Sequence, residues 1–318
     1  MRHHPCVIGT EESTIAHVTP PGTPLAEVDV TPELARALLA AQHPDLADLP
    51  ITPFGSGFDN VMLRLGDELA LRLPRREMSV PLVQYELRWL PLLAPRLPLP
   101  IPAPVREGVP GEGYPWPWSV VRWIDGEPAD VAPPADPVAT ADVLGRFLSA
   151  LHEPAPADAP VNPYRGVPLA ARADEMHTRL DALATPVAGV VAHDTVRAEV
   201  AAAIALPYWD GPPLWLHGDL HPRNILVSEG AISGIIDFGD ITSGDPATDL
   251  AVVWMLLPSD VHHRFRTAYG PIDDTTWQRA RAWALFFAIF LAFVAQRDGD
   301  PARAATATAP LARVFDER

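Results

Sequence analysis

Residues 214–249 decide the fold, and they read LWLHGDLHPRNILVSEGAISGIIDFGDITSGDPATD. Two short apolar strands are predicted within this stretch, at 224–228 and at 232–236. Glu229-Gly230 lies between them and is typical of a tight two-residue turn. The two strands are therefore expected to form a hairpin, which brings its two open ends together.

Three oxygen-bearing side chains converge on the open end of this hairpin. Asn224 enters the first strand, Asp237 follows the second, and Asp219 lies on the loop that leads in. Amide and carboxylate oxygens suit Mg²⁺, which takes one or two carboxylates together with waters and substrate phosphates. A carboxylate left free of the metal can accept a proton from a hydroxyl group. Phosphoryl transfer needs both a metal and such a base.

Two alternatives accompany this interpretation. The stretch could be a turn with acidic caps and no chemistry. His221, two residues after Asp219, could also belong to a transition-metal site, although the sequence shows no further histidine cluster to support zinc.

The same stretch resembles the aminoglycoside and macrolide phosphotransferases, which are protein-kinase-like small-molecule kinases. HGDLHPRN at 217–224 looks like their catalytic loop, which is similar to the H-R-D-x-x-x-x-N loop of protein kinases. IIDFG at 235–239 resembles the metal-binding D-F-G segment. Asp245-Pro246 and Asp249 match the segment that follows in this family.

This resemblance implies a role for each matching residue. Asp219 would be the catalytic base, and Asn224 and Asp237 would hold Mg²⁺. Asp249 would support the catalytic loop by accepting backbone hydrogen bonds. His217 would be a structural residue of the loop rather than the base.

The resemblance continues upstream, where a glycine-containing turn lies between two predicted strands. Gly55, Ser56, Gly57 and Asn60 stand where kinases place a phosphate-covering loop. Glycine permits tight turning and a close approach of backbone N–H groups to phosphate oxygens. An ordinary glycine turn is the alternative.

LALR at 69–72 aligns with the kinase strand V-A-I-K, so Arg72 replaces the usual Lys. All 24 basic residues are Arg, and any phosphate-anchoring cation must therefore be an Arg. Arg keeps the charge and can bind phosphate oxygens bidentately. Glu86, on a helix predicted over 80–94, resembles the acid that pairs with this cation; a solvent-facing Arg and Glu are the alternative.

A predicted strand at 119–124 ends at Asp125-Gly126 and resembles the hinge between the kinase lobes. The resemblance implies that Arg122 and Trp123 help to bind the nucleotide, although Trp123 could instead pack in the core. Because a hinge binds the purine through backbone groups, ATP and GTP both remain possible donors.

Predicted strands dominate the first third of the chain, and predicted helices dominate the rest. The expected fold is α+β and protein-kinase-like, with a small lobe that contains an antiparallel sheet and a larger helical lobe. Residues 1–28 are expected to be a flexible tail, and 29–124 the nucleotide-binding lobe with its hinge near 120–126. Residues 127–318 are expected to carry the catalytic loop and the acceptor site.

The net charge is −16, and the single cysteine is Cys6. The acidic charge argues against nucleic-acid binding, which needs clustered basic residues. It is compatible with a cationic substrate, or with solubility alone. One cysteine allows no internal disulfide and fits a cytoplasmic protein. The apolar stretch at 282–295 is shorter than a membrane span and is expected to be a buried helix.

The acceptor is the part of the function on which the sequence says least. Acids such as Asp174, Glu175 and Asp260 could bind a cationic aminoglycoside or could be solvated helix faces. The apolar stretch at 277–294 could line a macrolide pocket or could be a core helix.

The expected function is Mg²⁺-dependent transfer of the γ-phosphate of ATP or GTP to a hydroxyl of a small molecule. The resemblance suggests an antibiotic such as an aminoglycoside or a macrolide. The alternatives are a kinase of an endogenous metabolite or amino alcohol, and a nucleotide-binding pseudokinase in which Arg72 has disabled transfer.

Overall fold

The computed structural model describes residues 25–183, 191–299 and 301–316. Most of the predicted tail, residues 1–28, lies outside these ranges. The last residues of that stretch lie against the first lobe: the backbone N–H of Glu27 donates to the carbonyl of Arg75 at 2.8 Å. Val28 packs against the core of that lobe.

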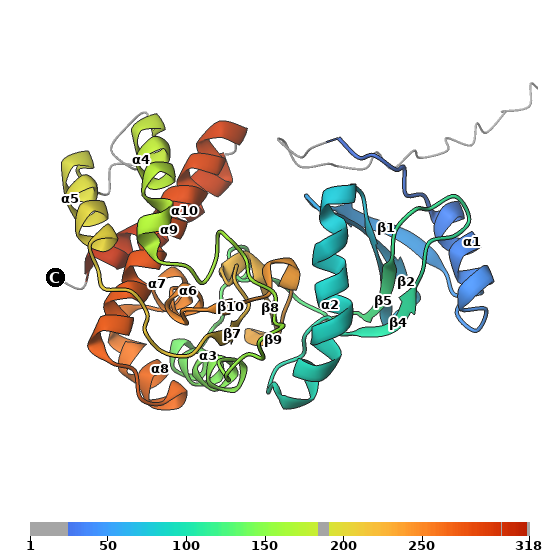
Figure 1. The fold of residues 1–318 in the computed structure, drawn as a ribbon, viewed down its shortest axis with the longest axis horizontal. Coiled ribbons are helices and arrows are strands. Elements are labelled where there is room, and N and C mark those ends of the chain that lie inside the picture. Colours follow the sequence, from blue (N-terminus) through green and yellow to red (C-terminus); the bar gives the residue numbers. More distant parts are fainter. Residues whose placement is uncertain (1–24, 184–190, 300, 317–318) are drawn as a thin grey trace, which may run out of the picture.

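An antiparallel sheet organises the first lobe (Figure 1). Its five strands lie in the order β1-β2-β3-β5-β4. The strands are β1 (Ile51–Ser56), β2 (Asn60–Leu65), β3 (Leu69–Pro74), β4 (Pro104–Gly108) and β5 (Trp118–Arg122).

The two faces of this sheet have different partners. Helix α1 (Pro32–Gln42) begins at Thr31, whose side chain accepts from the N–H of Leu34, and it packs its leucines against the apolar face. Side chains alternate along a strand, so Arg72 of β3 points to the opposite face from Leu71. On that side lies α2 (Val80–Leu93), between the sheet and the helical lobe (Figure 1).

The second lobe is mostly helical and contains two small sheets. The strands are β6 (Glu127–Pro128), β7 (Leu214–Leu216), β8 (Ile225–Ser228), β9 (Ala231–Ile235) and β10 (Thr242–Gly244). The helices are α3 (Pro137–Leu151), α4 (Ala173–Ala182), α5 (His193–Ile204), α6 (Ala247–Leu250), α7 (Val252–Leu256), α8 (His262–Tyr269), α9 (Asp274–Asp298) and α10 (Pro301–Asp316).

Helix α9 forms the centre of this lobe. By length and composition it could cross a membrane, yet 67% of its most apolar window is buried inside the structure. Trp283, Phe286 and Phe287 are fully buried among the other helices. The prediction of a buried helix over 282–295 is confirmed.

Candidate active site

The hairpin places Asn224 beside Asp237. Ile225 pairs with Ile235 in the β8–β9 register, and the N–H of Ile236 donates to the carbonyl of Asn224 at 2.9 Å. Asp237 has a left-handed backbone (φ 64°), and 61% of its side chain is exposed. The strand ends therefore present an amide and a solvent-facing carboxylate on one side.

Asp249 holds the loop that precedes this hairpin. Its Oδ2 accepts from the N–H of His217 at 2.6 Å, and its Oδ1 accepts from the N–H of Gly218 at 2.9 Å. His152 Nε2 lies 3.3 Å from Oδ2. Both Asp249 and His217 are buried, so these bonds are shielded from water and fix the loop backbone firmly.

The loop conformation also depends on His217 and Gly218 themselves. His217 Nε2 lies 2.9 Å from the carbonyl of Ile236, and Nδ1 accepts from the N–H of Asp219 at 3.2 Å. Gly218 has φ 87°, and a Cβ there would lie 2.2 Å from the carbonyl oxygen of Asp240. Only glycine fits between these segments.

Asp219 lies between two basic side chains. Arg165 donates from Nη2 to its Oδ1 at 2.8 Å, and His221 Nε2 lies 3.3 Å from its Oδ2. Burial raises the pKa of Asp219, but the positive charges of His221 and Arg165 outweigh burial and hold that pKa below its ordinary value. The group is therefore a carboxylate at neutral pH. Asn224 Nδ2 donates to the Asp219 carbonyl at 2.9 Å, which ties the loop to the hairpin.

The sequence did not indicate Arg165 as a partner of Asp219, and it set His221 beside Asp219 only as a possible metal site. Arg165 is one of 24 arginines and lies 54 residues before Asp219, on a loop without a motif. Only the fold brings the two together. The contact between His221 and Asp219 gives the histidine a partner without any metal, and the described residues contain no group of three His, Cys, Asp or Glu side chains that could hold a metal ion.

Arg72 reaches across from the first lobe. Its Nη2 lies 2.9 Å from Glu86 Oε1 and 4.0 Å from Asp237 Oδ1. Arg72 and Glu86 are both buried. Burial raises the pKa of Glu86 to about 7, although the charge of Arg72 opposes this shift. The Arg72–Glu86 pair therefore lies next to the exposed carboxylate of Asp237.

The glycine-containing turn lies between β1 and β2. The N–H of Gly57 donates to the carbonyl of Asn60 at 2.9 Å, and Arg75 Nη1 donates to the carbonyl of Gly57 at 3.0 Å. A Cβ added at Gly55 would meet no atom within 4 Å. Packing inside the described chain therefore gives no reason for a glycine at this position. Ser56, at the end of β1, pairs with Val61.

Trp123 follows β5, which lies between β3 and β4 in the sheet. Its backbone N–H donates to the carbonyl of Glu68 at 2.7 Å, so the backbone amide of Trp123 already has a partner. Its ring meets Phe54 edge-on at 4.7 Å, and the guanidinium of Arg64 lies 3.9 Å from the ring centroid. Arg122 is exposed and pairs with Leu69 through the backbone. Phe54, 65% exposed, is an aromatic neighbour that the sequence did not single out.

The residues at the hairpin end fit a magnesium ion. One carboxylate, Asp237, and one amide, Asn224, are the donor set that Mg²⁺ accepts when substrate phosphates and waters complete its shell. Asn224 Nδ2 donates a hydrogen bond to the Asp219 carbonyl, which leaves the amide oxygen Oδ1 as the atom that could bind the metal. Structural zinc sites are mostly built from Cys and His ligands, and neither Asn224 nor Asp237 is one of these.

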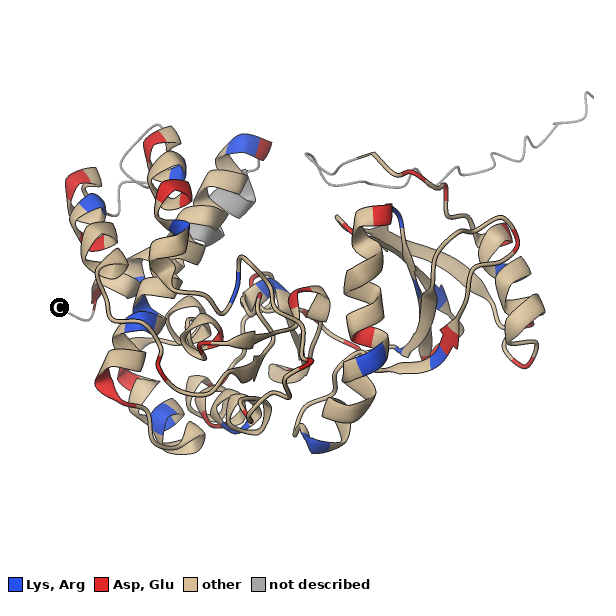
Figure 2. Ribbon diagram, viewed as in Figure 1, with Lys and Arg blue, Asp and Glu red and all other residues tan. Residues whose placement is uncertain are grey.

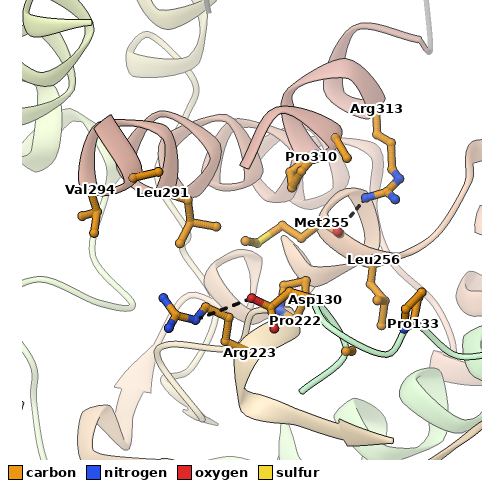
Figure 3. A pocket seen from close by; sticks show the side chains of 13 residues that line it. Asp130, Pro133, Pro222, Arg223, Met255, Leu256, Leu291, Val294, Pro310 and Arg313 are labelled. Atoms are coloured by element: carbon orange, nitrogen blue, oxygen red, sulfur yellow. Dashed lines mark hydrogen bonds and ion pairs between the residues drawn. The ribbon is translucent and has the colours of Figure 1, made fainter. Parts of the chain in front are cut away.

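Two hollows border the catalytic loop. One, of about 200 Å³, lies between that loop and the helices α7, α9 and α10, and its wall is mainly apolar (Figure 3). Arg223 lies 3.6 Å from Asp130 at its edge, and Arg313 donates to the Met255 carbonyl. The other, of about 500 Å³, is lined by Arg165 and Asp240 and therefore opens beside Asp219.

The chain is similar to several known proteins. It is 36% identical to viomycin phosphotransferase of Streptomyces vinaceus over 106 residues, which are 32% of this chain and 36% of that protein. It is 29% identical to the uncharacterized protein YcbJ of Bacillus subtilis over 73 residues, 23% of this chain and 24% of that protein. The matched segments thus span about a third or less of these relatives.

Solved structures of the same fold cover almost the whole chain. The GDP complex of aminoglycoside 2'-phosphotransferase-IIIa matches 89% of this chain and 98% of its own, with a TM-score of 0.65 and 19% identity. Macrolide 2'-phosphotransferase MphH from Brachybacterium faecium matches 88% of this chain and 97% of its own, with a TM-score of 0.57 and 23% identity. The prediction of a kinase-like α+β fold is confirmed.

A family model described as the phosphotransferase enzyme family, APH, matches residues 50–283. The match covers well over half of the chain and includes the hairpin, the catalytic loop and the Arg72–Glu86 pair. The resemblance drawn from 217–224 and 235–239 is confirmed, and the chain belongs to the APH phosphotransferase enzyme family.

Proposed function

We propose that this protein transfers the γ-phosphoryl group of ATP or GTP directly to a hydroxyl of a small molecule, with Asp219 as the base. The hydroxyl oxygen forms the new bond to phosphorus, and the bond from phosphorus to the β–γ bridging oxygen breaks. The hydroxyl proton passes to Asp219. No phosphoenzyme forms, because Asp219 acts as a base rather than as a nucleophile.

Each proposed site residue has a task in this scheme. Asn224 and Asp237 hold Mg²⁺, which when bound neutralises charge on the phosphates. Arg72 binds phosphate oxygens and is aimed by Glu86. Asp249 and His217 keep the loop in position.

The nucleotide binds between the glycine-containing turn at 55–60 and the hinge near 120–126. Gly55, Ser56, Gly57 and Asn60 approach its phosphates through backbone groups. Trp123 and Arg122 contact the base. The backbone N–H of Trp123 already donates to Glu68 and is not available to the base. Trp123 therefore contributes stacking through its ring.

A single observation carries the proposal: Asp219, the hairpin end and the cation of the first lobe form one continuous arrangement. Asn224 donates to Asp219, Asp237 follows on the paired strand, and Arg72 lies 4.0 Å from Asp237. These parts come from segments more than 140 residues apart in sequence, as the numbering of Arg72 and Asp219 shows. A turn with acidic caps would not need a buried cation from another lobe.

Similar proteins suggest which acceptors to test first. Their names include a viomycin phosphotransferase, aminoglycoside phosphotransferases and macrolide phosphotransferases. Hydroxylated antibiotics therefore belong in the acceptor panel. Endogenous hydroxylated metabolites and amino alcohols form the second class, and the charge of the acceptor cleft favours the anionic metabolites among them, as argued below.

A pseudokinase is disfavoured by the geometry around Arg72. The substituted cation keeps the acid partner that the kinase lysine has, at 2.9 Å, and Asp219, Asn224 and Asp237 are all present. A pseudokinase would be expected to have lost the base or one of the metal ligands.

The experiment is a nucleotide-consumption screen with mass spectrometry of the products. Purified protein, Mg²⁺ and either ATP or GTP are incubated with antibiotics, sugar acids and amino alcohols, and we expect a phosphorylated product. Asp219→Asn should lower its formation by about 10² to 10⁴, the usual contribution of general base catalysis. Unchanged turnover in that variant would sink the assigned mechanism, and nucleotide binding without transfer to any acceptor would favour the pseudokinase.

A further inference from the structure

The cleft of about 500 Å³ beside Asp219 has an unusual wall for a protein whose net charge is −16. Three arginines, two acids and two aromatic rings line it. They come from the loop before α4, from α4, from the segment after β9 and from α9. Figure 2 shows that both signs of charge occur on α4, beside α9. Arg165, one of the three arginines, is the residue that donates to Asp219.

Arg165 is paired with Asp219 and lies 4.0 Å from Asp240, whereas Arg172 and Arg179 have one carboxylate between them. Glu175 is shared, since its two oxygens pair with Arg172 and with Arg179. One carboxylate between two guanidinium groups leaves a surplus positive charge. Burial and the nearby Asp219 raise the pKa of Asp240, which lies 4.0 Å from Arg165.

The arginines also repel one another. Burial lowers the pKa of Arg179 to about 10, and the charges of Arg165 and Arg297 lower it further. The pKa of Arg172 is lowered by burial and by Arg165 and Arg179. Within the described ranges, Arg165 Nε and Arg172 Nε are buried without a hydrogen-bond partner. Such groups are costly unless an acceptor reaches them.

Aromatic rings hold the three guanidinium groups in place. Arg172 lies 4.8 Å from the ring centroid of Tyr164, Arg179 lies 4.4 Å from that of Phe290, and Arg165 lies 5.3 Å from that of Phe287. Cation–π contacts fix a cation without neutralising its charge. Arg172 and Arg179 are thus ordered and share one carboxylate, so the pair stays electropositive and suits a planar or tetrahedral oxyanion.

We propose that the acceptor carries a carboxylate or phosphate group, which Arg172 and Arg179 bind while its hydroxyl reaches Asp219. The inference rests on the proposed function and names its substrate class. A polycationic aminoglycoside would set ammonium groups against three arginines, and like charges across an interface are repulsive. Glu175, a candidate ligand for such a cation, is instead engaged by two arginines.

Matched acceptor pairs test this directly. Gluconate is compared with glucose, and glycerate with glycerol, with kanamycin as a cationic acceptor. Transfer from ATP is measured for each. We expect kcat/KM to be at least about tenfold higher for the anionic member of any pair that reacts, the range of one charge-assisted hydrogen bond. Preferred turnover of kanamycin or of the neutral partners would overturn the inference.

Two variants with opposite expected effects separate charge recognition from folding damage. Arg179→Gln should raise KM for the anionic acceptor about tenfold with a small change in kcat. Glu175→Gln should lower that KM, because the arginines lose their competing carboxylate. Arg197→Gln is the matched control: Arg197 is half-exposed, pairs with Asp181 and is not part of the cleft wall. A higher KM in Glu175→Gln would contradict the proposal.

A binding measurement covers the case in which no panel member reacts. With a non-hydrolysable ATP analogue at saturation, citrate and kanamycin are titrated by calorimetry. Citrate binding that Arg179→Gln weakens and Arg197→Gln retains supports the inference; kanamycin binding without citrate binding refutes it, as does binding of neither. The proposed function fails separately, if Asp219→Asn leaves turnover unchanged.

Discussion

Arg72 is where the chain departs from the kinase pattern, and its surroundings show how the departure is accommodated. One nitrogen, Nη2, lies 2.9 Å from Glu86 and 4.0 Å from Asp237, and the guanidinium has further donors in the same plane. A lysine ammonium is a point charge without this planar fork. The pair is buried, which strengthens the attraction and makes loss of either partner costly.

The raised pKa of Glu86 leads to a pH prediction. Glu86 carries its negative charge above about pH 7 and loses it below, so its hold on Arg72 weakens as the pH falls through that value. We expect kcat/KM for the nucleotide to fall from pH 8 to pH 6 with a midpoint near 7. Glu86→Gln should be low throughout and lack this step. Glu77→Gln, at an exposed neighbouring position, serves as control; a step that persists in Glu86→Gln would contradict the assignment.

At this scale the sequence predicted well only what a motif marks. Asn224 and Asp237 follow from the pairing of one hairpin, and Asp219 from its place on the loop that leads into it. Arg165 and the acceptor cleft do not, because they depend on how the loop before α4 packs against the catalytic loop. No local pattern separates Arg165 from the other arginines of the chain.

Among the elements, the β8–β9 hairpin and its supporting segment position the site. The hairpin was predictable because a two-residue turn separates two apolar runs. Strand β4 was not: the proline-rich stretch around it lacks alternation, and its register with β5 is irregular between Pro104 and Arg106. β4 lies at the edge of the sheet, where proline is tolerated.

The bonds from Asp249 to the loop predict a linked loss of stability and rate. Asp249→Asn replaces one accepting oxygen with an amide donor that faces a backbone N–H. We expect unfolding free energy to fall by about 3 kcal/mol, the order of one or two buried charge-assisted bonds, and kcat to fall with it. Urea unfolding and steady-state kinetics would show this. Asp260→Asn, at an exposed site, should change neither.

The turn of the hairpin predicts a gain in stability without a change in activity. Glu229 adopts φ 51° and Gly230 φ 78°, a conformation that Asn tolerates better than Glu. Glu229→Asn should therefore raise the unfolding free energy by about 0.5–1 kcal/mol. The turn lies at the opposite end of the hairpin from Asn224, so kcat should stay at the wild-type value. A lower melting temperature in Glu229→Asn would contradict the turn assignment.

At the scale of the whole molecule, Arg72 of the first lobe lies 4.0 Å from Asp237 of the second, so the site spans both lobes. A nucleotide bound between the turn at Gly57 and the hairpin end would connect both lobes. Ligand at 100 times its dissociation constant adds about 2.7 kcal/mol to stability. Saturating ATP should thus raise the melting temperature by several degrees.

Magnesium should enlarge that shift only when Asp237 is intact. We expect EDTA to reduce the ATP-dependent rise in the wild type, because the proposed metal would join Asn224 and Asp237 to the phosphates. Asp237→Asn should show a smaller rise that EDTA no longer alters. The measurement is differential scanning fluorimetry with ATP, with and without Mg²⁺. An equal response of the variant to Mg²⁺ would exclude Asp237 as a ligand.

The arginine at the phosphate anchor also changes which reagents can mark this protein. The sequence contains no Lys, so the nucleotide pocket offers no primary amine to acylating or aldehyde-bearing nucleotide analogues. A dicarbonyl compound condenses with guanidinium groups instead, and bound ATP should shield Arg72 from it. Covalent inhibitors that react with a lysine of the nucleotide pocket should therefore not modify this protein.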